Sequence, residues 1–164
     1  MSELDAVFQG RFDGKVAVLT GAASGIGRST AHRLAAEGAR IYGLDIDGEG
    51  LAVTRADVEA AGGTMATRVT DVRSVDECHA AIADAVDTFG RIDVLGNIAG
   101  IAWQRHVADV DEAAWDTMMA VNVKGVFFLS QAAIPHLLET EGNIVNIASN
   151  AGLMGQAYTV PYCA

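Results

Sequence analysis

The strongest chemical signal in the sequence is a glycine-rich run, TGAASGIG at residues 20–27, between an apolar run and a helical pattern. Glycine lets the backbone turn sharply and approach a pyrophosphate closely. The N-terminus of the following helix supplies unpaired N–H groups and a dipole that favours an anion. No Gly-Lys-Ser/Thr follows, which excludes a Walker-type phosphate loop. The residues expected to contact a dinucleotide here are Gly21, Ser24, Gly25, Ile26 and Gly27.

An acidic residue, Asp45, stands 20 residues after Gly25, at the end of the next apolar run. A carboxylate there would accept hydrogen bonds from the ribose hydroxyls of the adenosine half of the cofactor. It would also repel the extra phosphate of NADP, so NAD is the predicted cofactor. The alternative is that Asp45 only caps the following turn together with Asp47.

These residues must be positioned by strands and helices that alternate along the chain. Runs of strand length end in glycine-rich or polar turns, and longer helical patterns separate them. Strands are predicted at residues 15–20, 40–45, 64–69, 92–97 and 143–147. Helices are predicted at residues 25–37, 48–61 and 74–89, followed by a long helix that Asp111 opens and Gly142 ends. Ser74 is the predicted N-cap of the third helix, with Glu77 as its capping-box partner.

The predicted strands are apolar throughout instead of alternating with polar residues. Such strands are expected where helices cover both faces of a parallel sheet. The predicted fold is therefore a doubly wound α/β sheet of the Rossmann type. Its ligand would bind at the carboxyl ends of the strands, where the strand order reverses.

The motifs in this order resemble those of the short-chain dehydrogenase/reductase family from about Phe12 to Ala164. TGAASGIG resembles the cofactor loop of that family, and Asp71-Val72 resembles its adenine-contacting pair. The string NIAG at residues 97–100 resembles its NNAG motif, with Ile98 at the second Asn position. The resemblance implies five of the strands of this family and a role for Asn97 in cofactor binding and in stabilising the sheet.

The resemblance also implies three catalytic residues. Asn122 corresponds to the Asn embedded in a helix, where it bends the helix and holds a water in a proton relay. Ser149 and Tyr162 have the 13-residue spacing of the catalytic Ser and Tyr. Tyr162 would transfer the alcohol proton, contact the cofactor and act with Ser149, which would hydrogen-bond the substrate oxygen. Tyr158 competes for the Tyr role but lies only nine residues after Ser149.

The resemblance implies a Lys four residues after the Tyr, at position 166, whereas the sequence ends at Ala164. A free Tyr has a pKa of about 10, so roughly one in 1,000 is the phenolate at pH 7 without such a neighbour. We therefore expect one NAD-binding domain, residues 1–164, that lacks the catalytic Lys and the substrate lid. The function that the resemblance implies is hydride transfer between NAD(H) and an alcohol or ketone. The alternatives are a non-catalytic nucleotide-binding or assembly module and, more weakly, an adenosylmethionine-dependent methyltransferase.

Composition narrows the expected partners and location. The net charge of −10 disfavours nucleic acid and anionic membranes. The longest uncharged apolar stretch, residues 125–134, is well below the roughly 20 residues of a membrane span. The four His and two Cys residues show no metal-ligand spacing. Residues 1–15 are expected to be a short polar lead-in of a cytoplasmic protein, and a homo-oligomer is expected.

Trp103 and His106 lie in the loop where substrates of the family approach, although packing is their simpler role.

Overall fold

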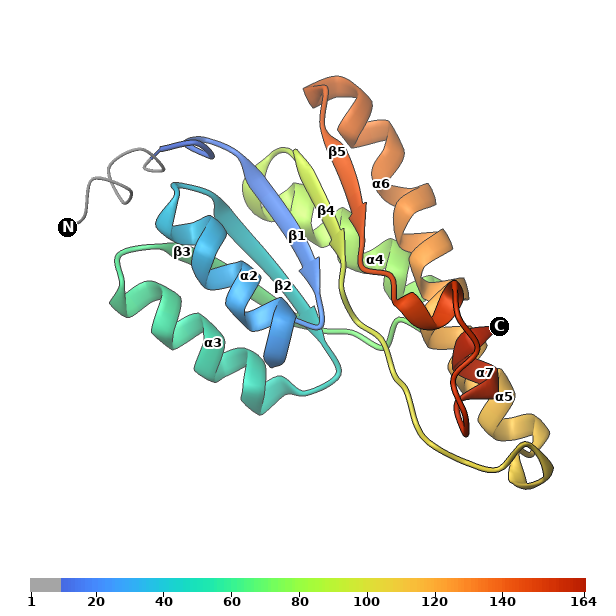
Figure 1. Ribbon diagram of the computed structural model, residues 1–164. Helices are drawn as coiled ribbons and strands as arrows, with labels where there is room; N and C mark the ends of the chain where they lie inside the picture. The colour runs from blue at the N-terminus through green and yellow to red at the C-terminus, as the bar shows by residue number, and fades with distance from the viewer. Residues whose placement is uncertain (1–9) are drawn as a thin grey trace.

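The structure is a computed structural model that describes residues 10–164. Most of the predicted polar lead-in, residues 1–9, lies outside the described residues. The described chain forms one parallel five-stranded sheet in the order β3-β2-β1-β4-β5 (Figure 1). The strands are β1 (Val16–Thr20), β2 (Arg40–Asp45), β3 (Thr64–Val69), β4 (Val94–Asn97) and β5 (Asn143–Asn146). The predicted fold class is confirmed.

Helices cover both faces of this sheet. Helices α2 and α3 lie on one face, and α4 and α6 lie on the other (Figure 1). The helices are α2 (Gly25–Ala36), α3 (Gly48–Ala60), α4 (Val75–Phe89), α5 (Glu112–Met119), α6 (Val126–Thr140) and α7 (Val160–Cys163). Three short elements are η1 (Val107–Asp109), the π-helical turn η2 (Ala120–Gly125) and η3 (Asn150–Gly152). The strand order reverses between β1 and β4, which places a crevice at the carboxyl ends of these two strands.

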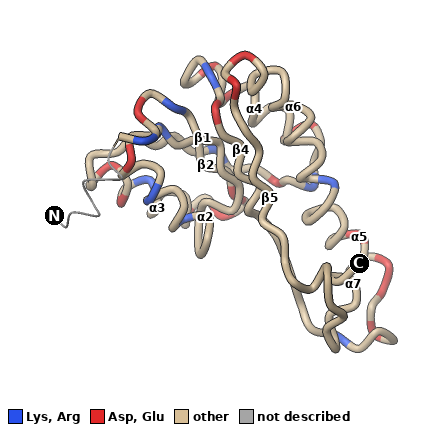
Figure 2. The backbone as a smooth tube through the Cα atoms, turned by 45° about the horizontal axis from the view of Figure 1, so that its top comes forward, with Lys and Arg blue, Asp and Glu red and all other residues tan. Residues whose placement is uncertain are grey.

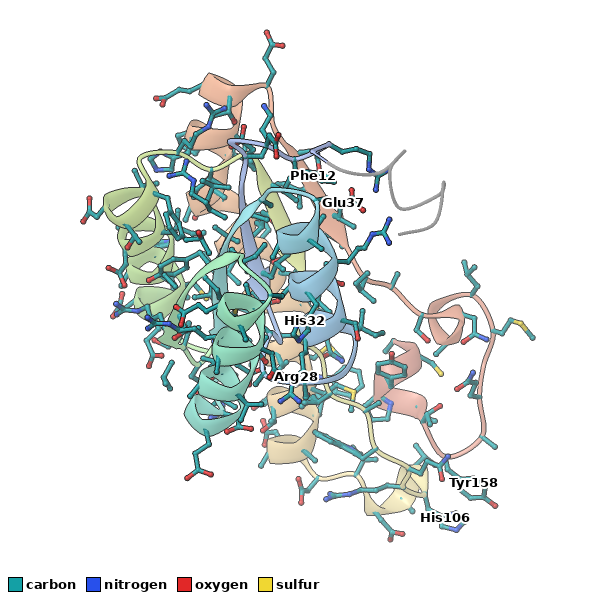
Figure 3. The ribbon with its side chains drawn as sticks, turned by 90° about the vertical axis from the view of Figure 1, so that its left-hand side faces the viewer. Phe12, Arg28, His32, Glu37, His106 and Tyr158 are labelled. Atoms are coloured by element: carbon teal, nitrogen blue, oxygen red, sulfur yellow. The ribbon has the colours of Figure 1, made fainter. Side chains whose placement is uncertain are left out.

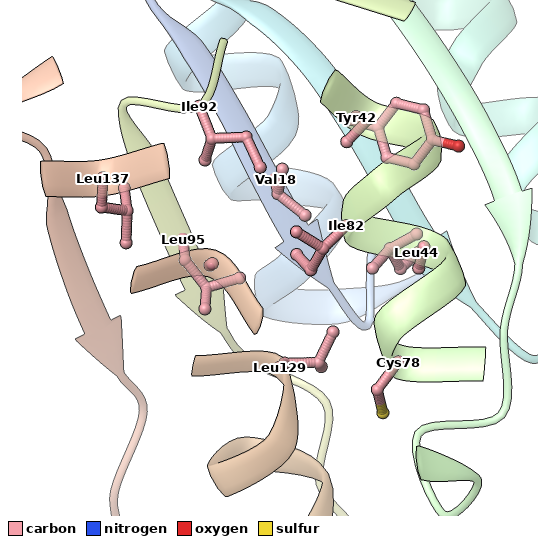
Figure 4. Packing of buried hydrophobic residues seen from close by; sticks show 12 residues of the cluster. Val18, Tyr42, Leu44, Cys78, Ile82, Ile92, Leu95, Leu129 and Leu137 are labelled. Atoms are coloured by element: carbon pink, nitrogen blue, oxygen red, sulfur yellow. The ribbon is translucent and has the colours of Figure 1, made fainter. Parts of the chain in front are cut away.

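The core consists of two apolar clusters, one on each face of the sheet. Along β1, Ala17 and Leu19 face the cluster under α2 and α3, whereas Val18 faces the cluster under α4 and α6. Figure 4 shows the second cluster, where Val18, Leu44 and Leu95 meet side chains from α4 and α6. Because successive strand residues point to opposite faces, an apolar strand serves both clusters at once.

The start of β4, one predicted capping box and the residue that ends α6 depart slightly from the prediction. Strand β4 begins at Val94 instead of Ile92, because Val16 N donates to the Asp93 carboxylate (2.9 Å) and not to a backbone carbonyl. Ser74 Oγ accepts from Glu77 N as predicted, but the Glu77 carboxylate accepts from Asp71 N (2.7 Å) and so does not complete a capping box. The left-handed residue that ends α6 is Glu141, at φ 52°, and not Gly142.

The Asp93 carboxylate binds groups at the amino-terminal ends of the central strands, on the side of the sheet opposite the crevice. It accepts from Lys15 Nζ (3.0 Å) and from Arg91 Nη2 (2.6 Å), while its own side chain is only 4% exposed. Burial alone would raise the pKa of Asp93, but these donors and Val16 N hold it below its ordinary value. Elsewhere, acidic and basic residues are spread over many elements, as Figure 2 shows.

The predicted long helix is a continuous helical run, α5–η2–α6, that widens into a π-turn around Asn122. By length and composition alone the run Glu112–Thr140 could cross a bilayer, unlike the shorter uncharged stretch considered in the sequence. This is weak evidence, because a core helix of a soluble protein meets the same criteria. In α6, Leu129, Ala133 and Leu137 are buried in the core under the sheet.

Candidate active site

A cleft of about 510 Å³ opens at the crevice where the strand order reverses. Its walls come from the turn after β1, the ends of β2 and β3, and the segment after β4. Eight of the predicted cofactor-binding residues line it: Gly21, Ser24, Gly25, Ile26, Gly27, Asp45, Asp71 and Val72. Folding thus brings together residues that lie up to 51 positions apart in the sequence.

The turn between β1 and α2 is possible only with glycine at two positions. Gly21 has φ 68°, and a Cβ there would lie 3.1 Å from Ala99 N. A Cβ on Gly27 would lie 2.0 Å from the carbonyl oxygen of Gly21, which is an impossible contact. The first turn of α2 therefore packs directly on the backbone of the loop. Ser24, the N-cap residue, makes no side-chain capping hydrogen bond.

A buried hydroxyl joins this turn to the segment after β4. Thr20 Oγ1 accepts from Ile98 N (2.8 Å) and from Ala99 N (2.9 Å). Sequence reasoning treated Thr20 only as the first residue of the glycine-rich run. The hydrogen bonds show that it holds the two walls of the cleft together.

Asp45 both lines the cleft and caps the turn after β2. One carboxylate oxygen accepts from Ala23 N and the other from Asp47 N, each at 3.0 Å. Asp47 in turn caps α3 by accepting from Gly50 N (3.0 Å). The capping role considered for Asp45 is therefore present together with its position in the cleft wall.

Several cleft residues were missed by the sequence reasoning. They are Leu44, Ile46, Thr70, Arg73, Ile98, Ala99, Gly100, Ile101, Thr117 and Val121. Arg73 directly follows the predicted Asp71-Val72 pair, so its position in the sequence was a usable signal. Thr117 and Val121 come from the long helical run, and no local pattern links them to the glycine-rich turn.

Asn97 lies beside the cleft and not in its lining. Its side chain is buried, and its amide Nδ2 donates to Asn146 Oδ1 (2.8 Å) and to Ser130 Oγ (3.1 Å). It thus connects β4 with β5 and α6, which fits the sheet-stabilising part of the prediction. Its predicted cofactor contact stays a prediction, since the side chain is not among those that line the cleft.

Asn122 occupies the π-helical turn η2 and faces the backbone of Ile101. Its Oδ1 accepts from Ile101 N (2.9 Å), and its Nδ2 donates to Ile101 O (2.8 Å). The π-turn is the distortion expected of the bent helix. Both polar atoms of the amide thus fix the segment after β4 against the long helix.

Ser149 and Tyr162 lie on neighbouring elements near the end of the chain. Ser149 is the N-cap of η3, where its Oγ accepts from Ala151 N (3.2 Å). Tyr162 is half-buried in α7, which packs against both η3 and α5. Ser149, Tyr162 and Asn122 do not line the 510 Å³ cleft themselves, although Asn122 holds Ile101, which does.

Tyr158, the competitor for the Tyr role, lies on the loop before α7 and faces His106. Their ring centroids are 4.8 Å apart in an edge arrangement, which Figure 3 shows at the far end of the molecule from α2. Tyr158 O also accepts from Arg105 N (2.7 Å). His106 therefore packs on another loop, and the Arg105 guanidinium lies over the Trp103 ring. Within residues 10–164, no group of three or more His, Cys, Asp or Glu side chains could hold a metal ion.

Comparison with known proteins identifies the family. The family model for short chain dehydrogenases matches residues 15–164. The chain is 41% identical over 164 residues to D-threitol dehydrogenase of Mycolicibacterium smegmatis, with 99% of this chain and 63% of that protein covered. It is 37% identical to sorbitol dehydrogenase of Cereibacter sphaeroides, with 94% of this chain and 60% of that protein covered. The chain belongs to the short-chain dehydrogenase family, as the motifs predicted, and spans about 60% of the length of these curated relatives.

Solved structures of this family share the fold closely. A short chain dehydrogenase/reductase from Burkholderia phymatum, in complex with NAD, has a TM-score of 0.89 and 35% identity, with 92% of this chain and 54% of that chain covered. Carveol dehydrogenase from Mycobacterium avium, also in complex with NAD, has a TM-score of 0.88 and 33% identity, with 94% and 61% covered.

Proposed function

We propose that this chain forms the NAD(H)-binding part of an oxidoreductase that transfers hydride between NAD(H) and an alcohol or ketone. The observation that carries the proposal is the cleft at the β1–β4 crevice, which has the glycine-rich turn at one wall and Asp45 at another. Membership of a family with dehydrogenase relatives favours this function over a non-catalytic binding module.

Three features of the cleft favour an NAD dinucleotide. Nothing lies within 4 Å of a Cβ position built on Gly25, so a pyrophosphate could approach the backbone of the turn closely there, and the N-terminus of α2 faces the same space. The exposed side chain of Ile26 offers apolar contact area next to this turn. NAD, when bound, supplies the nicotinamide that exchanges hydride with substrate carbon.

The residues of the chain would then bind, orient and move protons. Asp45 would hold the adenosine ribose, and Tyr162 would give or take the proton at the substrate oxygen while contacting the cofactor. Ser149 Oγ would donate a hydrogen bond to that oxygen. Asn122 would hold a relay water in addition to fixing Ile101.

We further propose that the protein is a cytoplasmic homo-oligomer that does not bind nucleic acid or membranes. The net charge of −10 supports the absence of anionic partners. Apolar side chains such as Phe127 (60% exposed) and Leu138 (75% exposed) support self-association through α6. Light scattering at increasing protein concentration tests this, and a monomer at all concentrations would contradict it.

Titration with NADH and separately with NADPH, followed by nicotinamide fluorescence, tests the cofactor site. The wild-type chain should bind NADH saturably and NADPH poorly. Asp45→Ala should weaken NADH binding by about tenfold, because a charged hydrogen-bond acceptor for the ribose is lost. The same variant should show a smaller preference for NADH over NADPH.

The matched control is Asp47→Ala, which removes a helix cap two residues away but no carboxylate from the cleft wall. It should cost about 1 kcal/mol of stability and leave the NADH-to-NADPH preference unchanged. A wild-type chain that binds neither dinucleotide, or an Asp45→Ala variant with unaltered preference, would contradict the proposed site.

A further inference from the structure

Two side chains that do not line the cleft hold the glycine-rich turn in place. Thr54, in α3, is fully buried, and its Oγ1 shares one proton between Ala22 O (2.9 Å) and Gly50 O (3.0 Å). Arg28, in the first turn of α2, donates from Nη2 to Ala23 O (2.5 Å) and from Nε to Thr54 Oγ1 (3.0 Å). The two side chains and the two carbonyl groups of the turn therefore form one continuous hydrogen-bond network.

The N–H groups of Ala22 and Ala23 are also occupied. Ala22 N donates to Leu44 O (3.1 Å) in β2, and Ala23 N donates to the Asp45 carboxylate (3.0 Å). Both alanines are buried, and all four of their backbone polar groups thus have a partner outside the turn. Rotation of either peptide group would leave a buried polar group unpaired, which is unfavourable.

We propose that Arg28 and Thr54 are positioning residues that keep the Ala22 and Ala23 carbonyls out of the cleft, so that the turn presents N–H groups to a pyrophosphate. This inference rests on the proposed NAD(H) function, because it concerns the turn that would bind the pyrophosphate. The C=O and N–H of a trans peptide point in opposite directions. Holding Ala23 O on Arg28 therefore directs the N–H of Ser24, which lines the cleft, the opposite way.

The peptide group that joins Ala22 to Ala23 has the same arrangement. Its carbonyl meets Thr54 outside the cleft, and its N–H meets Asp45, which lines the cleft. A carbonyl oxygen turned into the cleft would instead repel a pyrophosphate, because both carry negative charge. A turn that sampled such orientations would bind only in the fraction of molecules with the N–H groups correctly directed, and its affinity would fall by that fraction.

The test measures NADH affinity by fluorescence titration of variants at both positions. Thr54→Val keeps the shape of the side chain but removes the hydroxyl, and should weaken NADH binding about fivefold. Thr54→Ser keeps the hydroxyl and should restore the affinity to within about twofold of wild type. Arg28→Ala should weaken binding about tenfold, because a hydrogen bond from a charged donor is lost.

Two further variants test whether Arg28 and Thr54 act as one network. The double variant Arg28→Ala/Thr54→Val should bind NADH about tenfold more weakly than wild type, and not about fiftyfold, because the two losses overlap. Arg28→Lys should bind with an affinity between those of wild type and Arg28→Ala. A Lys ammonium is a compact charge on a flexible stem, so it holds Ala23 O less firmly than the planar guanidinium does.

The matched control is Val58→Ala, at a buried position on the same helix as Thr54, where the side chain makes none of these hydrogen bonds. It should lower the denaturant midpoint and leave the NADH affinity within about twofold of wild type. The control thus separates a loss of stability from a loss of turn orientation. Circular dichroism verifies that each titrated variant is folded, and the half-buried position of Arg28 carries the test if Thr54→Val does not fold.

Wild-type NADH affinity in folded Arg28→Ala or Thr54→Val, or an equal loss in Val58→Ala, would overturn the inference and leave the proposed function intact. Fully multiplicative losses in the double variant would also overturn it, since Arg28 and Thr54 would then act separately. A wild-type chain that binds no NADH would instead remove the proposed function and the inference together.

Discussion

The central strand β1 and the edge strand β5 belong to one sheet but differ sharply in how they are covered. All five residues of β1 are buried, whereas Ile144 is the only residue of β5 that is even half-buried. Beyond β5, Ile147 is 48% exposed and Leu153 is 90% exposed. Strand β1, in the middle of the sheet, is thus covered by helices on both faces and paired with a strand on each side. Within the described chain, β5 is paired with one strand only, and its side chains are mostly exposed.

This difference separates the two groups of candidate functional residues. The cofactor cleft stands on the buried strands and is joined by hydrogen bonds such as those to Thr20 Oγ1. Ser149 and Tyr162 stand on short elements after β5, where apolar contacts are sparse. Local opening costs least where buried apolar contacts are few. We therefore expect the cleft to be the more rigid region and the segment 147–164 to exchange amide hydrogens faster.

Substitution of Gly27 by Ala should have the largest effect of those considered. The new Cβ would overlap the Gly21 carbonyl oxygen, only 2.0 Å away, so the turn and the start of α2 must separate. We expect a loss of more than about 3 kcal/mol, at the upper end for overpacking, and no saturable NADH binding. Chemical denaturation and fluorescence titration measure the two effects.

Gly155→Ala is the matched control in the exposed region. Nothing lies within 4 Å of a Cβ built there, and its φ is not in the left-handed range. It should change stability by less than about 0.5 kcal/mol and leave NADH binding intact. Equal effects of the two substitutions would refute the proposed contrast between cleft and edge.

The same substitution in the two strands makes the comparison direct. Val18→Ala in β1 removes two methyl groups from a fully buried position and should cost about 2 kcal/mol. Val145→Ala in β5 removes them from a side chain that is 49% exposed and should cost under about 1 kcal/mol. Both losses of unfolding free energy are measured from the denaturant midpoints, provided that the dependence of the free energy on denaturant concentration is the same in all variants. A larger loss from Val145→Ala would show that β5 is covered in solution, for example by a second copy of the chain.

Asp93→Asn should lower the free energy of unfolding by about 2 kcal/mol at pH 7, because hydrogen bonds to a charged carboxylate at the amino-terminal ends of the strands are weakened. Because the folded pKa of Asp93 is lowered, its stabilisation is complete above its unfolded pKa of about 3.9 and is lost as the pH falls through the folded pKa. The stability difference between wild type and variant should therefore shrink below about pH 4. A difference that stays constant from pH 7 to pH 3 would exclude a role for the Asp93 charge.

Much of the fold could be predicted because each element carries its own signal. Apolar runs predicted all five strands, and Ser74 and Asp111 marked the starts of two helices through caps that the structure contains. The capping box predicted at Ser74 and the predicted start of β4 failed because a side chain met another partner. The Glu77 carboxylate accepts from Asp71 N, and the Asp93 carboxylate accepts from Val16 N, which β4 would otherwise have met.

The candidate site was predictable to the extent that its motifs are local. The glycine-rich turn, Asp45 and the Asp71-Val72 pair were found from sequence, because short-range backbone requirements and strand ends determine where they lie. Thr20 was missed as a contributor to the cleft, since its partners Ile98 N and Ala99 N are distant in the sequence and are supplied by folding. Arg73 was missed although it directly follows the predicted Asp71-Val72 pair.

The sequence by itself therefore determined the order of strands and helices, the parallel sheet, the family and the residues of the phosphate-binding turn, since periodicity and turn chemistry act over a few residues. Only the tertiary structure decided that Thr20 joins the two walls of the cleft, that Asn97 turns toward β5 and α6, and that Asn122 holds the backbone of Ile101. Those contacts join residues 21 to 79 positions apart, and the packing of the sheet and helices alone brings such polar groups within hydrogen-bonding distance.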